Sequence, residues 1–148
     1  MRFRIIAIVV AVAIAGAAAC FFVLRTPADD SQLILGKWSV VKWDDYGNSQ
    51  RRELIDGTEI EFTREKFRML NSGGIPDNTY VLDSTKSPKW ITLKEPIKSR
   101  EGLGIYELSG DDLKICLETR AISVRPNAFE SKHEPPNNML FVLKRKKP

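Results

Sequence analysis

Apolar and polar residues alternate along short segments of the chain from about residue 37 onward. A spacing of two places one set of side chains on one face of a β-strand and the other set on the opposite face. Charged residues such as Glu61 and Arg68 lie between the apolar ones. The pattern therefore predicts strands with one apolar and one solvated face. The clearest pairs are Ile60 with Phe62, Phe67 with Met69, Tyr80 with Leu82, and Phe141 with Leu143.

Runs rich in Val, Ile, Phe, Tyr, Trp and Thr, separated by Gly, Asn, Asp and Pro, predict eight strands. The hairpin signal is clearest at Ser109-Gly110-Asp111, which separates two such runs. Residues 49–55 are long enough for one or two helical turns, but no sustained helical periodicity follows residue 30. The predicted strands span residues 37–43, 58–63, 66–70, 79–82, 90–93, 104–108, 112–117 and 139–145.

Short strands in hairpin order predict an all-β domain in which sequential strands are antiparallel neighbours. A two-layer sandwich would give the same alternation, but a closed barrel also removes the unpaired edges of a sheet. We therefore expect an eight-stranded antiparallel up-and-down barrel. An N-terminal transmembrane helix or signal segment is expected to precede it.

That leader is the uninterrupted apolar run at residues 5–24. In a helix, about 20 residues cross a hydrocarbon core of roughly 30 Å. Arg2 and Arg4 precede the run, whereas Asp29 and Asp30 follow it, so the positive-inside rule predicts a cytoplasmic N-terminus. The predicted organisation is a cytoplasmic n-region at 1–4, a transmembrane anchor or signal h-region at 5–24, a linker at 25–30 and the barrel domain at 31–148.

Three fates of the leader are compatible with its sequence. Ala17, Ala18 and Ala19 match the small-residue pattern of a signal-peptidase site, which would release a secreted domain. Cys20 after these small residues also matches a bacterial lipoprotein signal. The apolar run continues past both positions, which favours a retained anchor with the domain outside the cytoplasm, on the periplasmic or cell-envelope side.

The charge distribution argues against a nucleic-acid partner. The 148-residue chain carries a formal net charge of +4, and its 23 basic and 19 acidic residues alternate along most of the sequence. Such mixing is typical of solvated strand faces and differs from the continuous basic stripe of nucleic-acid-binding proteins. The basic run at residues 144–147 is interpreted as a polar tail after the last strand.

Residues that perform catalysis or bind metals are sparse. The only His, His133, lies between Glu130 and Glu134 in a Pro-rich stretch with no Cys beside it. Cys116 falls in a predicted strand, and the only other Cys is Cys20 of the leader, so we expect a packed, unpaired thiol. We expect no catalytic residues, no metal and no cofactor, and hence a protein that is not an enzyme.

The longest irregular segment lies between Leu117 and Met139. Loops of this length in compact domains commonly carry function or act as flaps. If residues 119–138 cover an open barrel end, Arg125 and Phe129 would lie near the entrance, with Tyr80 and Trp90 as further candidate ligand contacts. The aromatic rings would supply burial and the guanidinium would orient a carboxylate or phosphate. Alternatively, Phe129 covers a filled core and Arg125 pairs with an acid.

A short apolar turn before Gly36-Lys37-Trp38, followed by hairpin strands and a basic residue at the end of the last one, resembles the Gly-x-Trp signature of the lipocalin superfamily. More narrowly, the chain is similar to the lipocalin-like domains called the Planctomycetes small domain family. The resemblance implies an eight-stranded barrel whose base is closed by Trp38, with Arg145 laid against it. Arg145 also shares parity with Phe141 and Leu143, which places it on the inward face. The other matching pieces are residues 80–89, 104–111 and 113–116, Arg125-Pro126 with Phe129, and residues 143–145.

Two functions remain open from the sequence. The first is a membrane-tethered, extracytoplasmic, lipocalin-like module that binds a small apolar or amphipathic ligand. The second is a solid-core barrel that contacts a cell-envelope protein and has no small-molecule ligand. A well-formed apolar pocket of roughly 300 Å³ or more at one barrel end would favour the first.

Overall fold

The computed structural model of the chain describes residues 29–71, 77–95, 100–118, 124–133 and 137–147. The predicted leader, including Cys20, lies outside these residues. No helix among the described residues is both long and apolar enough to cross a membrane.

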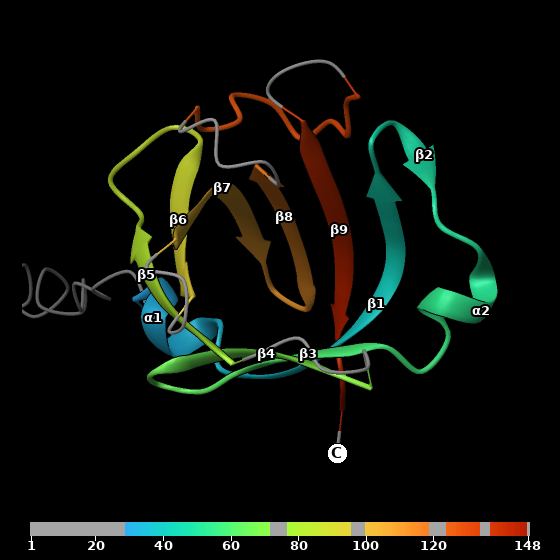
Figure 1. The fold of residues 1–148 in the computed structure, drawn as a ribbon. Coiled ribbons are helices and arrows are strands. Elements are labelled where there is room, and N and C mark those ends of the chain that lie inside the picture. Colours follow the sequence, from blue (N-terminus) through green and yellow to red (C-terminus); the bar gives the residue numbers. More distant parts are fainter. Residues whose placement is uncertain (1–28, 72–76, 96–99, 119–123, 134–136, 148) are drawn as a thin grey trace, which may run out of the picture.

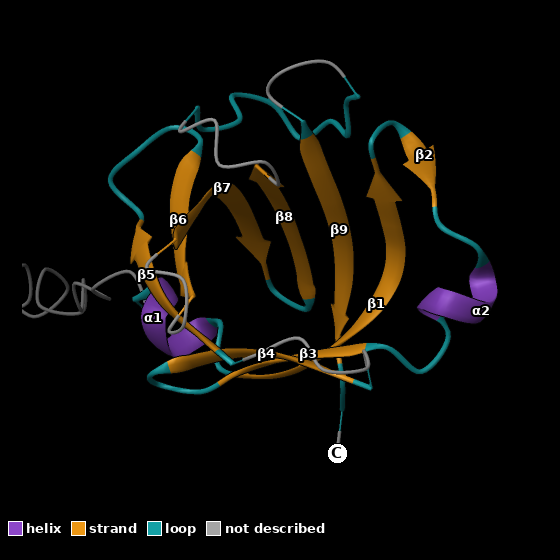
Figure 2. Ribbon diagram, in the orientation of Figure 1, coloured by secondary structure: helices purple, strands orange, loops and turns teal. Residues whose placement is uncertain are grey.

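The described residues form an all-β barrel with two short helices at its periphery (Figure 2). Each of the eight predicted strands is present, and the hairpin strand β2 was not predicted. The helix α2 falls within the stretch where one or two helical turns were expected. The elements are α1 (Asp30–Leu33), β1 (Gly36–Asp45), β2 (Asn48–Ser49), α2 (Arg52–Ile55), β3 (Glu59–Phe62), β4 (Lys66–Leu70), β5 (Asn78–Asp83), β6 (Lys89–Glu95), β7 (Arg100–Ser109), β8 (Asp112–Glu118) and β9 (Asn138–Arg145).

The barrel is closed, antiparallel and up-and-down. The strands run in the order β2-β1-β3-β4-β5-β6-β7-β8-β9, and β1 also pairs with β9 (Figure 1). The β1–β9 pairing extends from Trp38 opposite Arg145 to Asp45 opposite Met139. Because the first and last strands are joined, eight strands make a continuous wall, and β2 extends it as a hairpin on β1.

The inward face follows the predicted alternation. Ile60, Phe62, Phe67 and Phe141 all point into one core and are nearly or fully buried. Neighbours with the opposite parity, such as Glu61, are more exposed. The apolar pattern of the sequence therefore determines which side of each strand faces the barrel interior.

β1 changes its side-chain parity halfway along its length. Val40 lies opposite Leu143 and Lys42 lies opposite Val142, so Val41 is an extra residue that bulges from the ladder. A bulge shifts the residues after it by one position relative to strict alternation. Trp43 consequently lies opposite Phe141 on the inward face, the same face as Trp38 and Val40.

β1 is shared between two neighbours for only part of its length. Gly36 to Ser39 pair with β3, Trp38 to Asp45 pair with β9, and Asp44 and Asp45 pair with the short β2. The chain between β2 and β3 forms α2, which lies beside β1 (Figure 1). α2 therefore covers the wall where β1 no longer pairs with β3.

α1 packs at one end of the barrel through a buried carboxylate. Asp30 accepts hydrogen bonds from Lys89 Nζ and Tyr106 Oη, both at 2.7 Å. Burial, followed by the bond to Asp30, raises the pKa of Tyr106 above its ordinary value. The sequence placed Asp30 in a linker, but the folded unit includes it because its carboxylate bridges two barrel strands.

A second, smaller apolar cluster lies on the outer side of the wall. Ile105, Cys116 and Leu140 have the opposite parity to the core residues and are nonetheless buried. Phe129 packs against them. Residues 124–133, here called the strap, thus cover the outer face of β7, β8 and β9. In Figure 1 the strap passes along the barrel end opposite the C-terminus.

Candidate functional site

Trp38 and Arg145 lie together at the barrel end from which the C-terminus leaves. Trp38 is fully buried and donates from Nε1 to the carbonyl of Ile34 at 2.8 Å. The Arg145 guanidinium lies over the indole, with Cζ 4.2 Å from the ring centroid. It also donates to the carbonyls of Leu33 and Leu35. These contacts join both ends of the domain.

Gly36 lies beside this contact, and its backbone conformation favours glycine. Its φ is +112°, which L side chains rarely adopt, whereas a Cβ there would make only an ordinary contact, 3.7 Å from Arg145 Nη1. The Gly-x-Trp pattern therefore combines an unusual backbone turn with the large residue that fills the barrel base.

The four candidate ligand-binding residues do not converge on one site. Tyr80 points into the barrel, packs edge-to-face on Phe62 with ring centroids 5.2 Å apart, and donates its hydroxyl to the carbonyl of Thr63 at 2.7 Å. Burial raises the Tyr80 pKa. Trp90 has the opposite parity and lies on the outer wall, where 38% of its surface is exposed.

Arg125 lies with Trp90 on the outer wall and not at a barrel entrance. Its Cζ is 4.5 Å from the centroid of the Trp90 ring. The guanidinium donates to the carbonyls of Ile91 and Gly104 and, at 3.0 Å, to Thr92 Oγ1. Burial lowers the Arg125 pKa. Since these bonds occupy the guanidinium, we correct the expectation that it orients a ligand head group at the barrel mouth.

Phe129 occupies a place that neither sequence interpretation anticipated. It contacts Ile105, Cys116 and Leu140 outside the wall, so it neither plugs the barrel core nor lines a mouth. Cys116 donates from Sγ to the carbonyl of Glu130 at 3.4 Å, and burial raises the pKa of the thiol to about 11. This thiol is a packed residue covered by the strap.

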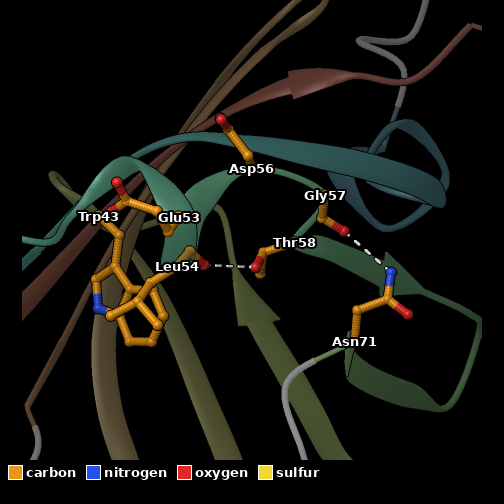
Figure 3. Close-up of a pocket in the computed structure, with 7 residues that line it drawn as sticks. All are labelled: Trp43, Glu53, Leu54, Asp56, Gly57, Thr58 and Asn71. Atoms are coloured by element: carbon orange, nitrogen blue, oxygen red, sulfur yellow. Dashed lines mark hydrogen bonds between the residues drawn. The ribbon is translucent and has the colours of Figure 1, made fainter.

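A pocket of about 490 Å³ lies between α2, β1 and the β3–β4 hairpin. Figure 3 shows Trp43 and Leu54 on one side, Asn71 on the other, and Thr58 between them. α2 contributes Glu53 and Leu54, and the turn after it contributes Asp56 and Gly57. The lining residues are Trp43, Glu53, Leu54, Asp56, Gly57, Thr58 and Asn71.

Thr58 and Asn71, which line the pocket, each donate a hydrogen bond to a backbone carbonyl. Thr58 Oγ1 donates to the carbonyl of Leu54 at 2.8 Å, and Asn71 Nδ2 donates to the carbonyl of Gly57 at 3.0 Å. Trp43 packs on Phe141 with ring centroids 5.3 Å apart. Its Nε1 is buried without a hydrogen-bond partner and points away from Thr58 and Asn71 (Figure 3). The pocket wall therefore combines the Trp43 and Leu54 side chains with polar residues, and the Thr58 hydroxyl and one N–H of Asn71 are bonded within the protein.

Asp45 is an inward-facing carboxylate near this region. It follows Trp43 by two residues in β1 and lies opposite Met139. Its Oδ1 is buried without a hydrogen-bond partner. Burial raises the Asp45 pKa, and a hydrogen bond from the backbone N–H of Tyr46 partly offsets this effect.

Sequence interpretation missed the pocket. Turns at Asp56-Gly57 and at Asn71 frame it, and both Gly57 and Asn71 have positive φ, at 81° and 63°. The available signal was the short helical stretch flanked by those turns. Strict alternation also gave no reason to place Trp43 on the same face as Trp38.

Among the described residues, no group of three or more His, Cys, Asp and Glu side chains is arranged to bind a metal ion. His133 lies in the strap and packs edge-to-face against Tyr46, with ring centroids 6.0 Å apart. No protein-family model, curated protein or solved structure significantly matches this chain.

Proposed function

We propose that this protein is a small-ligand-binding β-barrel, held at a membrane by its leader with the barrel outside the cytoplasm. The observation that carries the binding role is the pocket of about 490 Å³ beside α2. Small-molecule sites are typically concave, about 300–1,000 Å³, and mostly apolar with a few polar groups. Its indole and leucine surface, with Glu53 on α2 and Asp56 in the turn after it, is suited to an amphipathic molecule.

The barrel axis is a poorer place for a ligand than this lateral pocket. A Cβ at Gly104 would lie 2.5 Å from Leu117 Cδ2 and 2.7 Å from the carbonyl oxygen of Cys116. Trp38, Phe62 and Phe141 also fill the interior. We therefore assign binding to the pocket that α2 forms with β1 and the β3–β4 hairpin.

Co-purification tests this assignment. Leu54 is 49% exposed, so Leu54→Trp should fill the pocket without disturbing the core. Val81→Trp, at a 57% exposed position of the outer wall, is the matched control. The full-length chain is isolated from native membranes and bound small molecules are identified by mass spectrometry. We expect a compound that is enriched with wild type and Val81→Trp and depleted with Leu54→Trp; no enriched compound with wild type would contradict the proposal.

The localisation needs its own measurement. Fractionation should place the chain in membranes, with the barrel accessible to protease from outside the cytoplasm. A soluble form lacking residues 1–19 would contradict the retained anchor. Unchanged membrane retention of Cys20→Ala would remove the lipoprotein alternative.

The filled core supports a second candidate, a solid barrel that binds a cell-envelope protein. Trp90 is exposed on the outer wall and is flanked by two cations, Arg125 and Lys86, whose Nζ is 5.1 Å from the ring centroid. Exposed aromatic and Arg side chains are enriched at protein interfaces. Crosslinking from position 81 beside this surface, with no ligand in the pocket, would favour this candidate.

A further inference from the structure

We propose that the pocket beside α2 selects a cationic ligand: an ammonium group on a small apolar body. This inference rests on the proposed binding function and adds the charge of the ligand to it. It reverses the polarity expected from the sequence, in which Arg125 was to orient a carboxylate or phosphate.

The two acidic residues of the pocket lining lack ion-pair partners in the part of the chain that the structure describes. Most described carboxylates lie within 4.0 Å of a Lys or Arg nitrogen, as in the pairs Asp112–Lys144 and Asp77–Arg68. Glu53 and Asp56 line the pocket, and neither has an ion-pair partner among the described residues. Asp29, Asp45 and Glu65, outside the pocket, share this property. The two carboxylates of the pocket lining attract a cation and repel an anion.

The pocket lining also lacks cationic groups that would bind an anion. None of the seven lining residues is Lys, Arg or His. Arg51 and Arg52 are exposed residues outside the lining. Thr58 and Asn71, which would be natural donors to an anion, already donate to backbone carbonyls. The charged groups left for a ligand are therefore carboxylates.

The apolar part of the pocket wall suits an organic cation. Trp43 and Leu54 face the same space in Figure 3. An indole face attracts a quaternary ammonium group, and an aliphatic side chain contacts its organic substituents. Inorganic cations lack such substituents, so the wall favours an organic cation over a metal ion.

Two water-soluble probes of similar shape and opposite charge test the inference: benzyltrimethylammonium and phenylacetate. The full-length protein is held in neutral phosphatidylcholine nanodiscs, and binding is measured by equilibrium dialysis against empty nanodiscs. We expect the cation to bind about tenfold more tightly than the anion, because attraction of one probe and repulsion of the other act together.

Matched double variants locate the source of the selectivity. Glu53→Gln with Asp56→Asn should reduce the cation preference to about twofold or less. Glu101→Gln with Glu107→Gln removes the same charge from exposed positions of β7, where both acids pair with lysines, and should keep the preference. Loss of preference in both double variants would show a general charge effect and overturn the inference.

The two proposals fail in different ways. Equal binding of both probes to wild type, abolished by Leu54→Trp, would overturn the cationic assignment and leave the pocket as a binding site. Absence of binding by both probes, together with no compound enriched on purification, would overturn both proposals.

Discussion

The bulge at Val41 decides which residue reaches the pocket. Without the extra residue, strict alternation would place Trp43 on the outer wall and Lys42 inside. With it, Trp43 packs on Phe141 and lines the pocket. Alternation in the sequence predicts the core face of most strands, but nothing in the Val-Val-Lys run marks the bulge, because it depends on the register against β9.

The partly buried Asp45 makes stability depend on pH. Because burial raises the folded-state pKa of Asp45, folding favours the protonated carboxyl group. The stability that the protonated form gives is present in full below the ordinary carboxyl pKa and is lost as pH rises through the folded-state pKa. Asp45→Asn should therefore have the same melting temperature as wild type at pH 3. Its melting temperature should become higher than that of wild type as pH rises from the ordinary carboxyl pKa through the folded-state pKa of Asp45. Thermal denaturation from pH 3 to pH 8 measures the difference.

An exposed acid provides the control for Asp45. Glu65 lies in the turn before β4, and Glu65→Gln makes the same acid-to-amide change at an exposed position. A wild-type melting curve that matches Asp45→Asn at every pH would contradict the role given to Asp45.

Two inward-facing glycines of β7 differ sharply in the space around them. A Cβ at Gly104 would lie 2.5 Å from Leu117 Cδ2, whereas the nearest atom to a Cβ at Gly102 is 3.6 Å away. Gly104→Ala should cost about 1–3 kcal/mol of unfolding free energy through overpacking. Gly102→Ala should be neutral or slightly stabilising. Urea denaturation compares the pair, and equal midpoints would show that the barrel interior has room at Gly104.

At the scale of elements, the strap is a layer outside the barrel that the sequence did not predict. Phe129 and Arg125 were candidates for a barrel mouth because the segment is long and irregular, with a covered core and an acid partner as the alternative. The relevant signal was present in β7, β8 and β9: Ile105, Cys116 and Leu140 are apolar at outward positions. An apolar outer face needs a cover, but parity alone does not show which segment supplies it.

The strap should control access to Cys116. Phe129→Ala removes the side chain that packs on the outer cluster, so alkylation of Cys116 by iodoacetamide should become faster. The measurement is made by mass spectrometry in a Cys20→Ala background, so that only this thiol reacts. Val124→Ala, at an exposed position of the strap, is the control and should react like the parent. An unchanged rate in Phe129→Ala would show that the strap does not shield the thiol.

For the whole molecule, the closed eight-stranded barrel was predictable because hairpin turns and alternation act locally along the chain. The lateral pocket was not, because it depends on where β1 ends its pairing with β3 and on how α2 fills that place. These are properties of strand register and closure. Local sequence patterns specify them only weakly.

Because Trp38 lies where the barrel closes, its loss should destabilise the whole domain. Trp38→Ala removes a fully buried indole at the junction of β1, β3 and β9 and should cost about 3–5 kcal/mol, enough to unfold a small domain. Trp90→Ala removes the same side chain from the outer wall and should cost about 1 kcal/mol or less. Circular dichroism at increasing urea compares them, and equal stability of the two variants would contradict the closing role of Trp38.

The contact that closes the barrel also orders events during synthesis of the protein. Arg145 donates to the carbonyl of Leu35, which lies 110 positions earlier in the chain. A ribosome completes β9 last, so the Trp38 indole lacks its Arg145 cover and the β1–β9 pairing cannot form until almost the whole chain has emerged. The barrel therefore cannot close until synthesis of the chain is nearly complete.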